Sequence, residues 1–277
     1  MRELAAFAIS ELASSGVEYG DARVEDRAVE SMTFRGMRLE DAVDSTSEGI
    51  GVRAIVNGCW GFASSTGLDR EAVSTAVERA VRIAASGAGR TGSRVRLSAQ
   101  TPQMGSYSSP CIEDPFGVDK SEKMGLLEEC SRIMNSNPAI TSTYAQLHSE
   151  RIDRVFASTE GTLVESHLIH TQPFLQAFAV HGGDAQSRSL QTGARAAGWE
   201  WIRENDLLAA SERVRDEAIE KVMAPEGPSG VMDLVLDGLN LSLTMHESVG
   251  HATESDRALG WEANMAGRTF VRLSDPG

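Results

Sequence analysis

Apolar residues recur at helical spacing in two stretches of the amino-terminal part of the chain. The first stretch predicts an opening helix of about three turns that stops at Gly16. The second begins after Asp69, carries a single apolar face and ends at Gly87. The apolar positions that define these two helices are Leu4, Phe7, Ala8 and Leu12 in the first, and Val73, Val77, Ala80, Val81 and Ala84 in the second.

Between these helices the polarity pattern changes to the two-residue period of strands. Residues 21–26 and 31–35 alternate between apolar and polar side chains. Residues 51–56 and 59–63 flank Asn57-Gly58, which is the strongest two-residue signal for a β-hairpin. The first part of the chain is therefore predicted to combine helices with antiparallel strands.

Further along the chain, a segment without apolar period separates a second set of elements. Residues 88–117 are rich in Gly, Ser, Arg and Pro, which is typical of a linker or a long surface connection. Asp119 and Glu122 then form a capped start for a helix that Asn137-Pro138 ends. The alternating stretches that follow, between residues 140 and 180, predict an antiparallel meander.

The last predicted elements lead to the most chemically informative segment. Residues 206–223 have helical spacing, and Pro and Gly residues interrupt the chain directly afterwards. The short apolar run 231–236 then predicts a buried strand.

Together these patterns predict an α+β fold, with antiparallel sheets, packed helices and two domains. Residues 1–87 would form an amino-terminal α+β domain, and residues 88–118 a linker or long connection. Residues 119–224 would form an α+β extension with the meander, and residues 225–277 the start of a carboxyl-terminal domain. A length of 277 residues favours two domains over one, because a single core stops growing near this size.

Composition and charge exclude several classes of protein. There are 26 Lys and Arg residues against 40 Asp and Glu, a net charge of −14, so a nucleic-acid partner is not expected. No apolar run approaches the roughly 18 residues of a membrane span, and we expect a soluble, cytoplasmic protein. Cys59, Cys111 and Cys130 are widely spaced and form no CxxC pair, which is typical of reduced thiols.

One motif suggests metal chemistry: His246, Glu247 and His251 form His-Glu-x-x-x-His. Two imidazoles hold a metal in many hydrolases, and a neighbouring carboxylate serves as general base toward a water molecule. On an ideal helix, however, a five-residue step places the histidines about 140° apart around the axis and about 7.5 Å apart along it. An additional residue in the turn, a π-bulge, would bring them to one face, and Gly250 permits such distortion. We therefore expect a bulge or a helix end within residues 249–251.

Spacing alone leaves alternatives open for these side chains. A His-Glu pair and a second histidine also occur on solvated helix faces without any metal. Glu254 lies three residues beyond His251, so it is a candidate ligand, a partner that orients an imidazole, or a surface charge. His167 and His170 are three apart in a predicted strand, where an odd separation sends side chains to opposite faces, so they are not expected to share a metal.

Two stretches of the sequence resemble the TldD/PmbA family of metallopeptidases, once labelled modulators of DNA gyrase. The stretch from Met232 to Phe270, MDLVLDGLNLSLTMHESVGHATESDRALGWEANMAGRTF, resembles the family signature. The stretch from Tyr19 to Ser65, YGDARVEDRAVESMTFRGMRLEDAVDSTSEGIGVRAIVNGCWGFASS, resembles its first domain. The motif points to the TldD-like, catalytic side, because PmbA-like (TldE) subunits lack it.

The resemblance implies a zinc-dependent peptidase acting on peptides or unfolded segments. It implies that His246 and His251 bind Zn²⁺ and that Glu247 is the base. It also implies a two-subunit particle, either a homodimer or a heterodimer with a PmbA-like (TldE) subunit, whose active sites face an internal cavity.

The family's third ligand, a cysteine near the end of a chain of well over 400 residues, would lie beyond Gly277. The chain is thus expected to be truncated at the carboxyl end and, alone, inactive for lack of that ligand. The alternative interpretation is a catalytically silent binding or assembly subunit, or an inactive fragment of such a peptidase.

Overall fold

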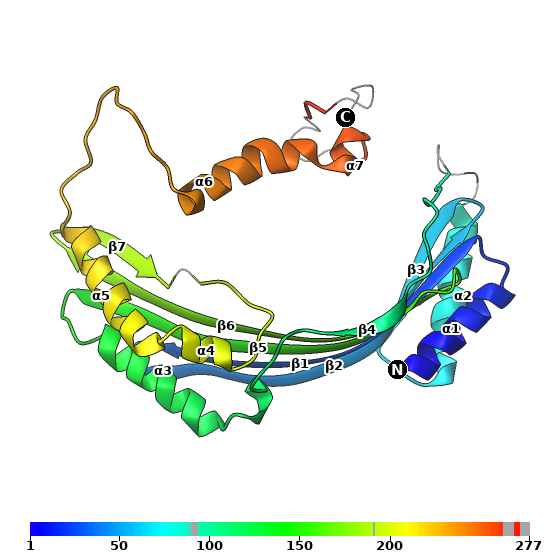
Figure 1. The fold of residues 1–277 in the computed structure, drawn as a ribbon, viewed down its shortest axis with the longest axis horizontal. Helices are drawn as coiled ribbons and strands as arrows, with labels where there is room; N and C mark the ends of the chain where they lie inside the picture. Colours follow the sequence, from blue (N-terminus) through cyan, green and yellow to red (C-terminus); the bar gives the residue numbers. More distant parts are fainter. Residues whose placement is uncertain (88, 90–93, 191, 263–268, 272–277) are drawn as a thin grey trace. The chain divides into compact units, whose positions relative to one another are not determined.

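The structure is a computed structural model that describes all residues except 88, 90–93, 191, 263–268 and 272–277. It divides into two compact units, residues 1–224 and residues 225–277, and each is described by itself. Figure 1 shows the elements in chain order.

Four of the helices described in the first unit form where the sequence predicts them, and the short helix α4 was not predicted. Helix α1 ends just before Gly16, whose φ of +66° suits a residue without a side chain. Helix α3 begins after Asp119, whose side chain accepts a hydrogen bond from the Ser121 amide at 2.7 Å. The bounds are α1 Arg2–Ser14, α2 Arg70–Gly87, α3 Lys120–Met134, α4 Glu200–Glu204 and α5 Leu207–Met223.

In the described part of the chain, seven strands form one sheet, in the order β3-β2-β1-β5-β6-β4, with β7 paired to β6. All neighbours are antiparallel except β4 and β6, which run parallel. The α+β class and the antiparallel meander are therefore confirmed. The strands are β1 Tyr19–Arg35, β2 Arg38–Val56, β3 Cys59–Ser65, β4 Met104–Ser108, β5 Ile140–Ser158, β6 Leu163–His181 and β7 Asp184–Ser189.

The hairpin between β2 and β3 turns at Asn57-Gly58, as predicted. Both residues have positive φ, 52° and 73°, which a two-residue hairpin turn of this kind requires. Asparagine and glycine tolerate this region best, so the turn fixes the register that pairs Val56 with Cys59.

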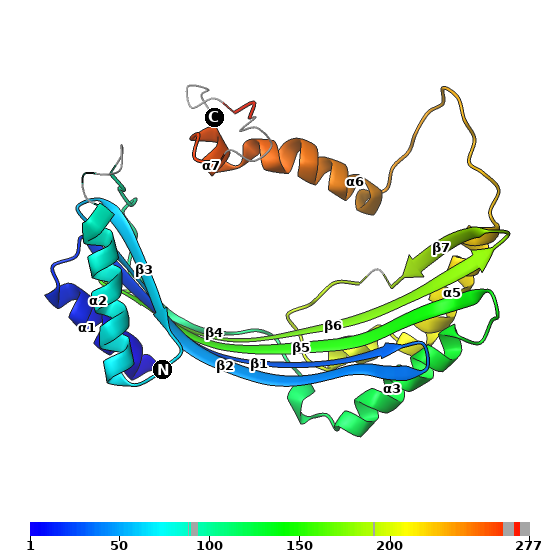
Figure 2. The same ribbon diagram turned by 180° about the vertical axis from the view of Figure 1, so that it is seen from behind.

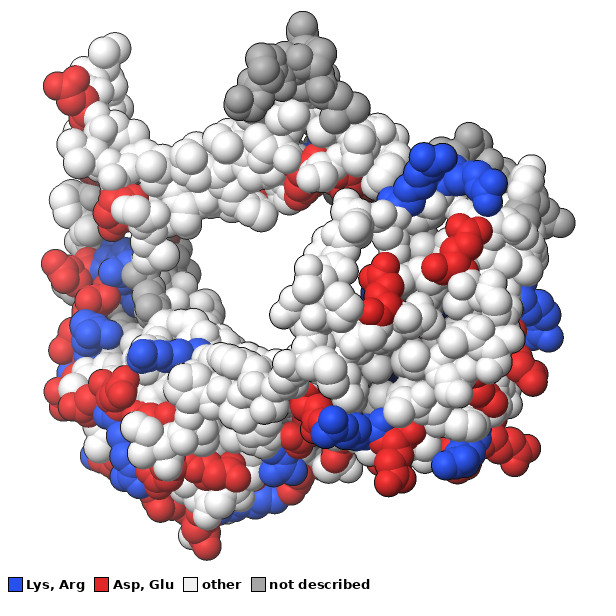
Figure 3. Space-filling model, turned by 45° about the vertical axis from the view of Figure 1, so that its right-hand side comes forward, with Lys and Arg blue, Asp and Glu red and all other residues white. Residues whose placement is uncertain are grey.

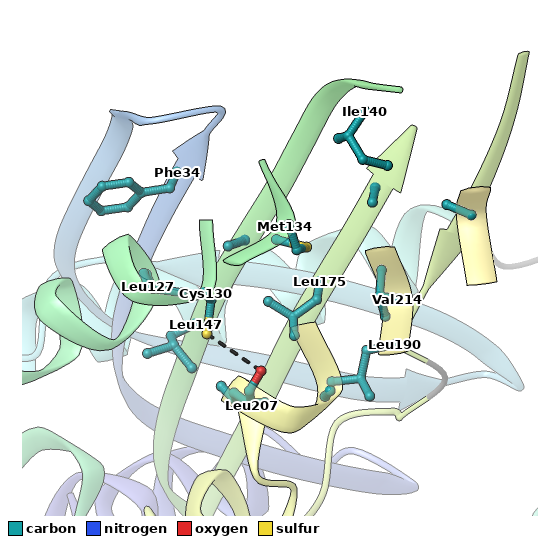
Figure 4. Close-up of a cluster of buried hydrophobic side chains, with 14 of the residues drawn as sticks. Phe34, Leu127, Cys130, Met134, Ile140, Leu147, Leu175, Leu190, Leu207 and Val214 are labelled. Atoms are coloured by element: carbon teal, nitrogen blue, oxygen red, sulfur yellow. Dashed lines mark hydrogen bonds between the residues drawn. The ribbon is translucent and has the colours of Figure 1, made fainter. Parts of the chain in front are cut away.

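The helices pack on one face of the sheet, where they bury two separate hydrophobic clusters. The first cluster lies between α1, α2 and the strand end that holds Ala22 and Val24. The second lies under α3, α4 and α5 and contains Leu147 and Leu175 (Figure 4). Figure 2 shows the two helical groups at opposite ends of the sheet. The register places Asp21, Arg23 and the other odd-numbered residues of β1 on the face away from these helices.

A buried ion pair joins α3 to the sheet between the clusters. The Lys123 side chain is 2% exposed, and its Nζ donates to a Glu30 carboxylate oxygen and, at 2.5 Å, to the Pro115 carbonyl. The Trp199 ring centroid lies 5.7 Å from the same ammonium group. Lys120, which is half exposed, lies 3.9 Å from Glu30.

The predicted separation of residues 1–87 from residues 119–224 stays a prediction. In the structure both segments belong to one compact unit, because β1 pairs with β5 from Asp21 to Arg35. Residues 104–108 of the connection form β4, which pairs with β6.

The predicted strand at residues 231–236 is wrong. These residues have no regular structure, and Val231 and Val235 are almost fully exposed. A strand needs a neighbour to accept its backbone hydrogen bonds, and none of the strands described in the structure pairs with this segment. Its apolar composition alone therefore did not define a strand.

Charged side chains of both signs are interspersed on the surface seen in Figure 3. Among the described residues, no helix is both long and apolar enough to cross a membrane.

Candidate metal centre

The His-Glu-x-x-x-His motif lies on a helix that widens at the motif. Helix α6, Gly238–Met245, starts with a cap in which the Asp237 carboxylate accepts from the Asn240 amide at 2.7 Å. A π-helical turn, His246–Gly250, follows directly, and its closing bond runs from the His251 amide to the His246 carbonyl. The predicted bulge is confirmed.

The wider turn brings the two imidazoles together. The ring centroids of His246 and His251 are 4.3 Å apart, with their planes at 66°. On a regular α-helix the same two residues would point in directions about 140° apart. A short 3₁₀ turn, His251–Thr253, then ends the helix, and α7, Ser255–Ala258, follows.

Glu247 adds a carboxylate to this pair. One potential ligand atom from each of His246, Glu247 and His251 lies within 4.8 Å of the others. The Glu247 Oε2 atom is 3.7 Å from His251 Nε2. Two ligands of one zinc ion at about 2.1 Å each are at most about 4.2 Å apart, so small side-chain rotations suffice for the group to hold a cation. Imidazole nitrogen and carboxylate oxygen are also donors that zinc accepts.

Glu254 and Arg257, which lie beyond the motif in sequence, fix the His251 ring. Glu254 Oε1 lies 2.8 Å from His251 Nδ1, which leaves Nε2 on the side of Glu247. The other Glu254 oxygen lies 2.9 Å from an Arg257 guanidinium nitrogen. Of the three possibilities left open for Glu254, this geometry matches a partner that orients an imidazole.

Sequence reasoning missed Arg257. Its side chain is 2% exposed, and besides holding Glu254 it donates a hydrogen bond to the His251 carbonyl. The guanidinium therefore ties the backbone and the side-chain partner of one imidazole together. The only signal in the sequence was the three-residue spacing from Glu254, which is common on exposed helices.

The remaining histidines and cysteines belong to the first unit, residues 1–224. His167 and His170 lie on opposite faces of β6, as predicted, and each faces a carboxylate of β5, Asp153 and Glu150 respectively. Burial raises the pKa of the Cys130 thiol to about 11, which disfavours the thiolate that a metal or a nucleophilic step needs. Among the described residues, the motif residues alone gather three potential metal ligands.

Comparison with known proteins places the first unit of the chain in a family. Residues 20–84 match the model described as PmbA/TldA metallopeptidase domain 1, and residues 113–224 match the PmbA/TldA metallopeptidase central domain. Together the two models cover more than half of the chain. The chain belongs to the TldD/PmbA family.

Individual relatives agree with this assignment. A metalloprotease of Methanothermobacter thermautotrophicus is 24% identical over 94% of this chain and 56% of its own length. A metalloprotease TldD homolog of Haemophilus influenzae is 24% identical over 87% of this chain and 50% of its own. The chain thus spans about half the length of the curated relatives that it matches.

Solved structures show the same fold. A Bacteroides thetaiotaomicron protein described as a modulator of DNA gyrase superposes with a TM-score of 0.70 at 15% identity, over 93% of this chain and 58% of its own. TldE from Thermococcus kodakarensis superposes with a TM-score of 0.52 at 15% identity, over 79% of this chain and 47% of its own. At these identities the likeness concerns the fold alone.

Proposed function

We propose that this chain is the TldD-like subunit of a zinc-dependent peptidase that cleaves peptides or unfolded segments. The observation that carries the proposal is the π-helical turn, which brings both imidazoles and the Glu247 carboxylate to one place. The relatives named metalloproteases support the reaction class. His246 and His251 would hold the ion, which when bound polarises the scissile carbonyl.

The other side chains of the site have separate tasks. Glu247 is the general base: its carboxylate accepts a proton from the attacking water and passes it to the departing amine. Glu254 and Arg257 act through His251, because they hold its Nδ1 side and its carbonyl and so keep Nε2 directed to the site. The half-exposed Glu247 side chain is accessible to solvent water.

The proposal extends to assembly. The structural likeness to TldE suggests a partnership of the TldD/TldE type, with a related or an identical second subunit. Co-purification with a TldE-like chain, or a dimer mass by light scattering, would identify the partner.

The test separates metal binding from proton transfer. In a complete version of the protein that also supplies the third ligand, we expect Glu247→Gln to keep bound zinc, because the imidazoles remain, and to lower hydrolysis of an unstructured peptide by roughly 10² or more. His246→Ala and His251→Ala should lose the zinc itself. The exposed His181 serves as the matched control, and His181→Ala should change neither quantity.

Zinc content is measured by mass spectrometry and hydrolysis with a quenched fluorescent peptide. If Glu247→Gln cleaved at the parent rate, or lost zinc as fully as the histidine variants, Glu247 would not be the base. Absence of zinc from the folded parent chain would instead support a catalytically silent subunit.

A further inference from the structure

A pocket of about 730 Å³ lies at the β3 end of the sheet, in the unit that does not contain the metal motif. Its side chains come from β1, β2 and β3 at positions that face away from α1 and α2, among them Asp21, Arg23, Arg53, Phe62 and Ser64. Its volume falls within the range of small-molecule sites, roughly 300–1,000 Å³.

Gly51 lines this pocket without a side chain of its own. It lies in the interior strand β2, opposite Arg23 on β1 and Ser64 on β3. A Cβ atom at this position would contact only the Phe62 ring, at 3.4 and 3.8 Å. Gly61 differs, because a Cβ there would come within 2.0 Å of the Ala80 carbonyl of α2. Gly61 is thus required by helix packing, whereas at Gly51 only the Phe62 ring, which itself lines the pocket, lies close to the missing side chain. Glycine in a strand interior is typical of places where a ligand approaches the backbone closely.

Two ion pairs neutralise most of the charges around this space. Arg53 donates to both carboxylate oxygens of the buried Asp21, at 2.7–3.0 Å. Two guanidinium nitrogens of Arg154, on β5, lie 2.7–2.8 Å from one carboxylate oxygen of Glu25, Oε2. Both acids therefore already have their cations.

Arg23 lies between these two pairs. Its guanidinium lies 5.7 Å from the centroid of the Phe156 ring, and within the described residues it meets no carboxylate. Glu48 also lines the pocket and forms no ion pair with the described residues. The pocket thus offers one cation and one anion, with the exposed Phe62 ring beside them.

We propose that this pocket binds the α-carboxylate of a short peptide through Arg23. A guanidinium matches a carboxylate with two parallel hydrogen bonds. Ser64 adds a hydroxyl, Phe62 covers an apolar side chain, and Glu48 suits a free amino group. A phosphate dianion fits less well, because three carboxylates line the pocket and two of the cations near them are already paired. The proposal does not depend on hydrolysis, since none of these residues belongs to the metal motif.

The test is calorimetric titration of the full chain with the dipeptide Gly-Phe and with its carboxyl-terminal amide. A metal chelator is present throughout, so that cleavage cannot consume the ligand and a failure here leaves the proposed function untouched. We expect the dipeptide to bind at least about tenfold more tightly than the amide, the size of one charge-assisted hydrogen bond. Free phenylalanine, titrated in parallel, distinguishes an amino-acid site from a peptide site.

Single-residue variants test whether Arg23 binds the carboxylate of the dipeptide. Arg23→Gln should reduce dipeptide affinity to that of the amide, and Gly51→Ala should weaken both ligands because its methyl group enters the pocket. Arg27→Gln is the matched control, since Arg27 shares the strand and the face but is paired with Glu150 and does not line the pocket. Equal affinity for dipeptide and amide, unchanged binding by Arg23→Gln, or preferential binding of inorganic phosphate would each overturn the proposal.

Discussion

The buried pair between Lys123 and Glu30 allows a quantitative test of how the sheet is joined to α3. Lys123→Met keeps the length of the side chain but removes the cation, so the carboxylate of Glu30, 6% exposed, keeps only the more distant Lys120. Breaking a buried pair from one side costs about 3–5 kcal/mol, and the remaining cation places the expected loss near the lower limit, about 3 kcal/mol. The Pro115 carbonyl loses a hydrogen bond in the same variant.

In a unit of this size a loss of about 3 kcal/mol corresponds to a melting temperature lower by about 6–12 °C. The assay is urea denaturation followed by far-ultraviolet circular dichroism, for both single variants and for Lys123→Met/Glu30→Met. The double variant should lose less unfolding free energy than the two single variants lose together, because it leaves no unpaired charge behind. Lys120→Met is the control and should leave stability nearly unchanged. A loss below about 1 kcal/mol for Lys123→Met, or strictly additive losses, would refute the reasoning.

Further predictions concern two glycines and the partly buried phenol of Tyr19. Gly61→Ala should cost about 3 kcal/mol in unfolding free energy, because its methyl group would collide with the Ala80 carbonyl. A Cβ at Gly125 of α3 would meet nothing within 4 Å, so Gly125→Ala should raise the unfolding free energy by about 0.5–1 kcal/mol. Equal melting temperatures for the Gly61 and Gly125 variants would contradict this difference. Burial and the charge of Asp21 raise the pKa of Tyr19 to about 12. The folded state then holds this proton more tightly than the unfolded state, so stability should fall as pH rises from about 10 through 12. Tyr19→Phe should remove a tyrosinate absorbance change near pH 12, and the absence of any difference would disprove the shift.

Local signals in the sequence predicted the elements whose geometry is set by neighbouring residues. Asn57-Gly58 fixed a turn because its two residues tolerate positive φ, and Asp119 fixed a helix start because its carboxylate reaches an amide two residues on. The lengths of the strands were underestimated. The polar middle of β1 has no apolar alternation, and its strand conformation depends on hydrogen bonds to β5, which lies far away in sequence.

In the candidate site, too, the sequence predicted some features and not others. The need for a wider turn followed from helix geometry, since His246 and His251 cannot meet on a regular helix. The roles of Glu254 and Arg257 did not follow, because a three-residue spacing has the same form on a solvated helix as beside an imidazole. The exposed run at residues 231–236 marks the opposite limit: apolar composition suggested a strand where the described structure provides no neighbour.

The pairing of β1 with β5 has a consequence for how the protein is made. Glu25 and Arg154, which face each other across these strands, are 129 residues apart in sequence. At a synthesis rate of about 5–20 residues per second, β1 leaves the ribosome roughly 6–25 s before its partner. During that interval the β1–β2 hairpin presents an unpaired edge, so the emerging chain depends on delayed completion of the sheet. Chaperones would consequently bind the nascent amino-terminal segment during this interval, and early misfolding would begin there.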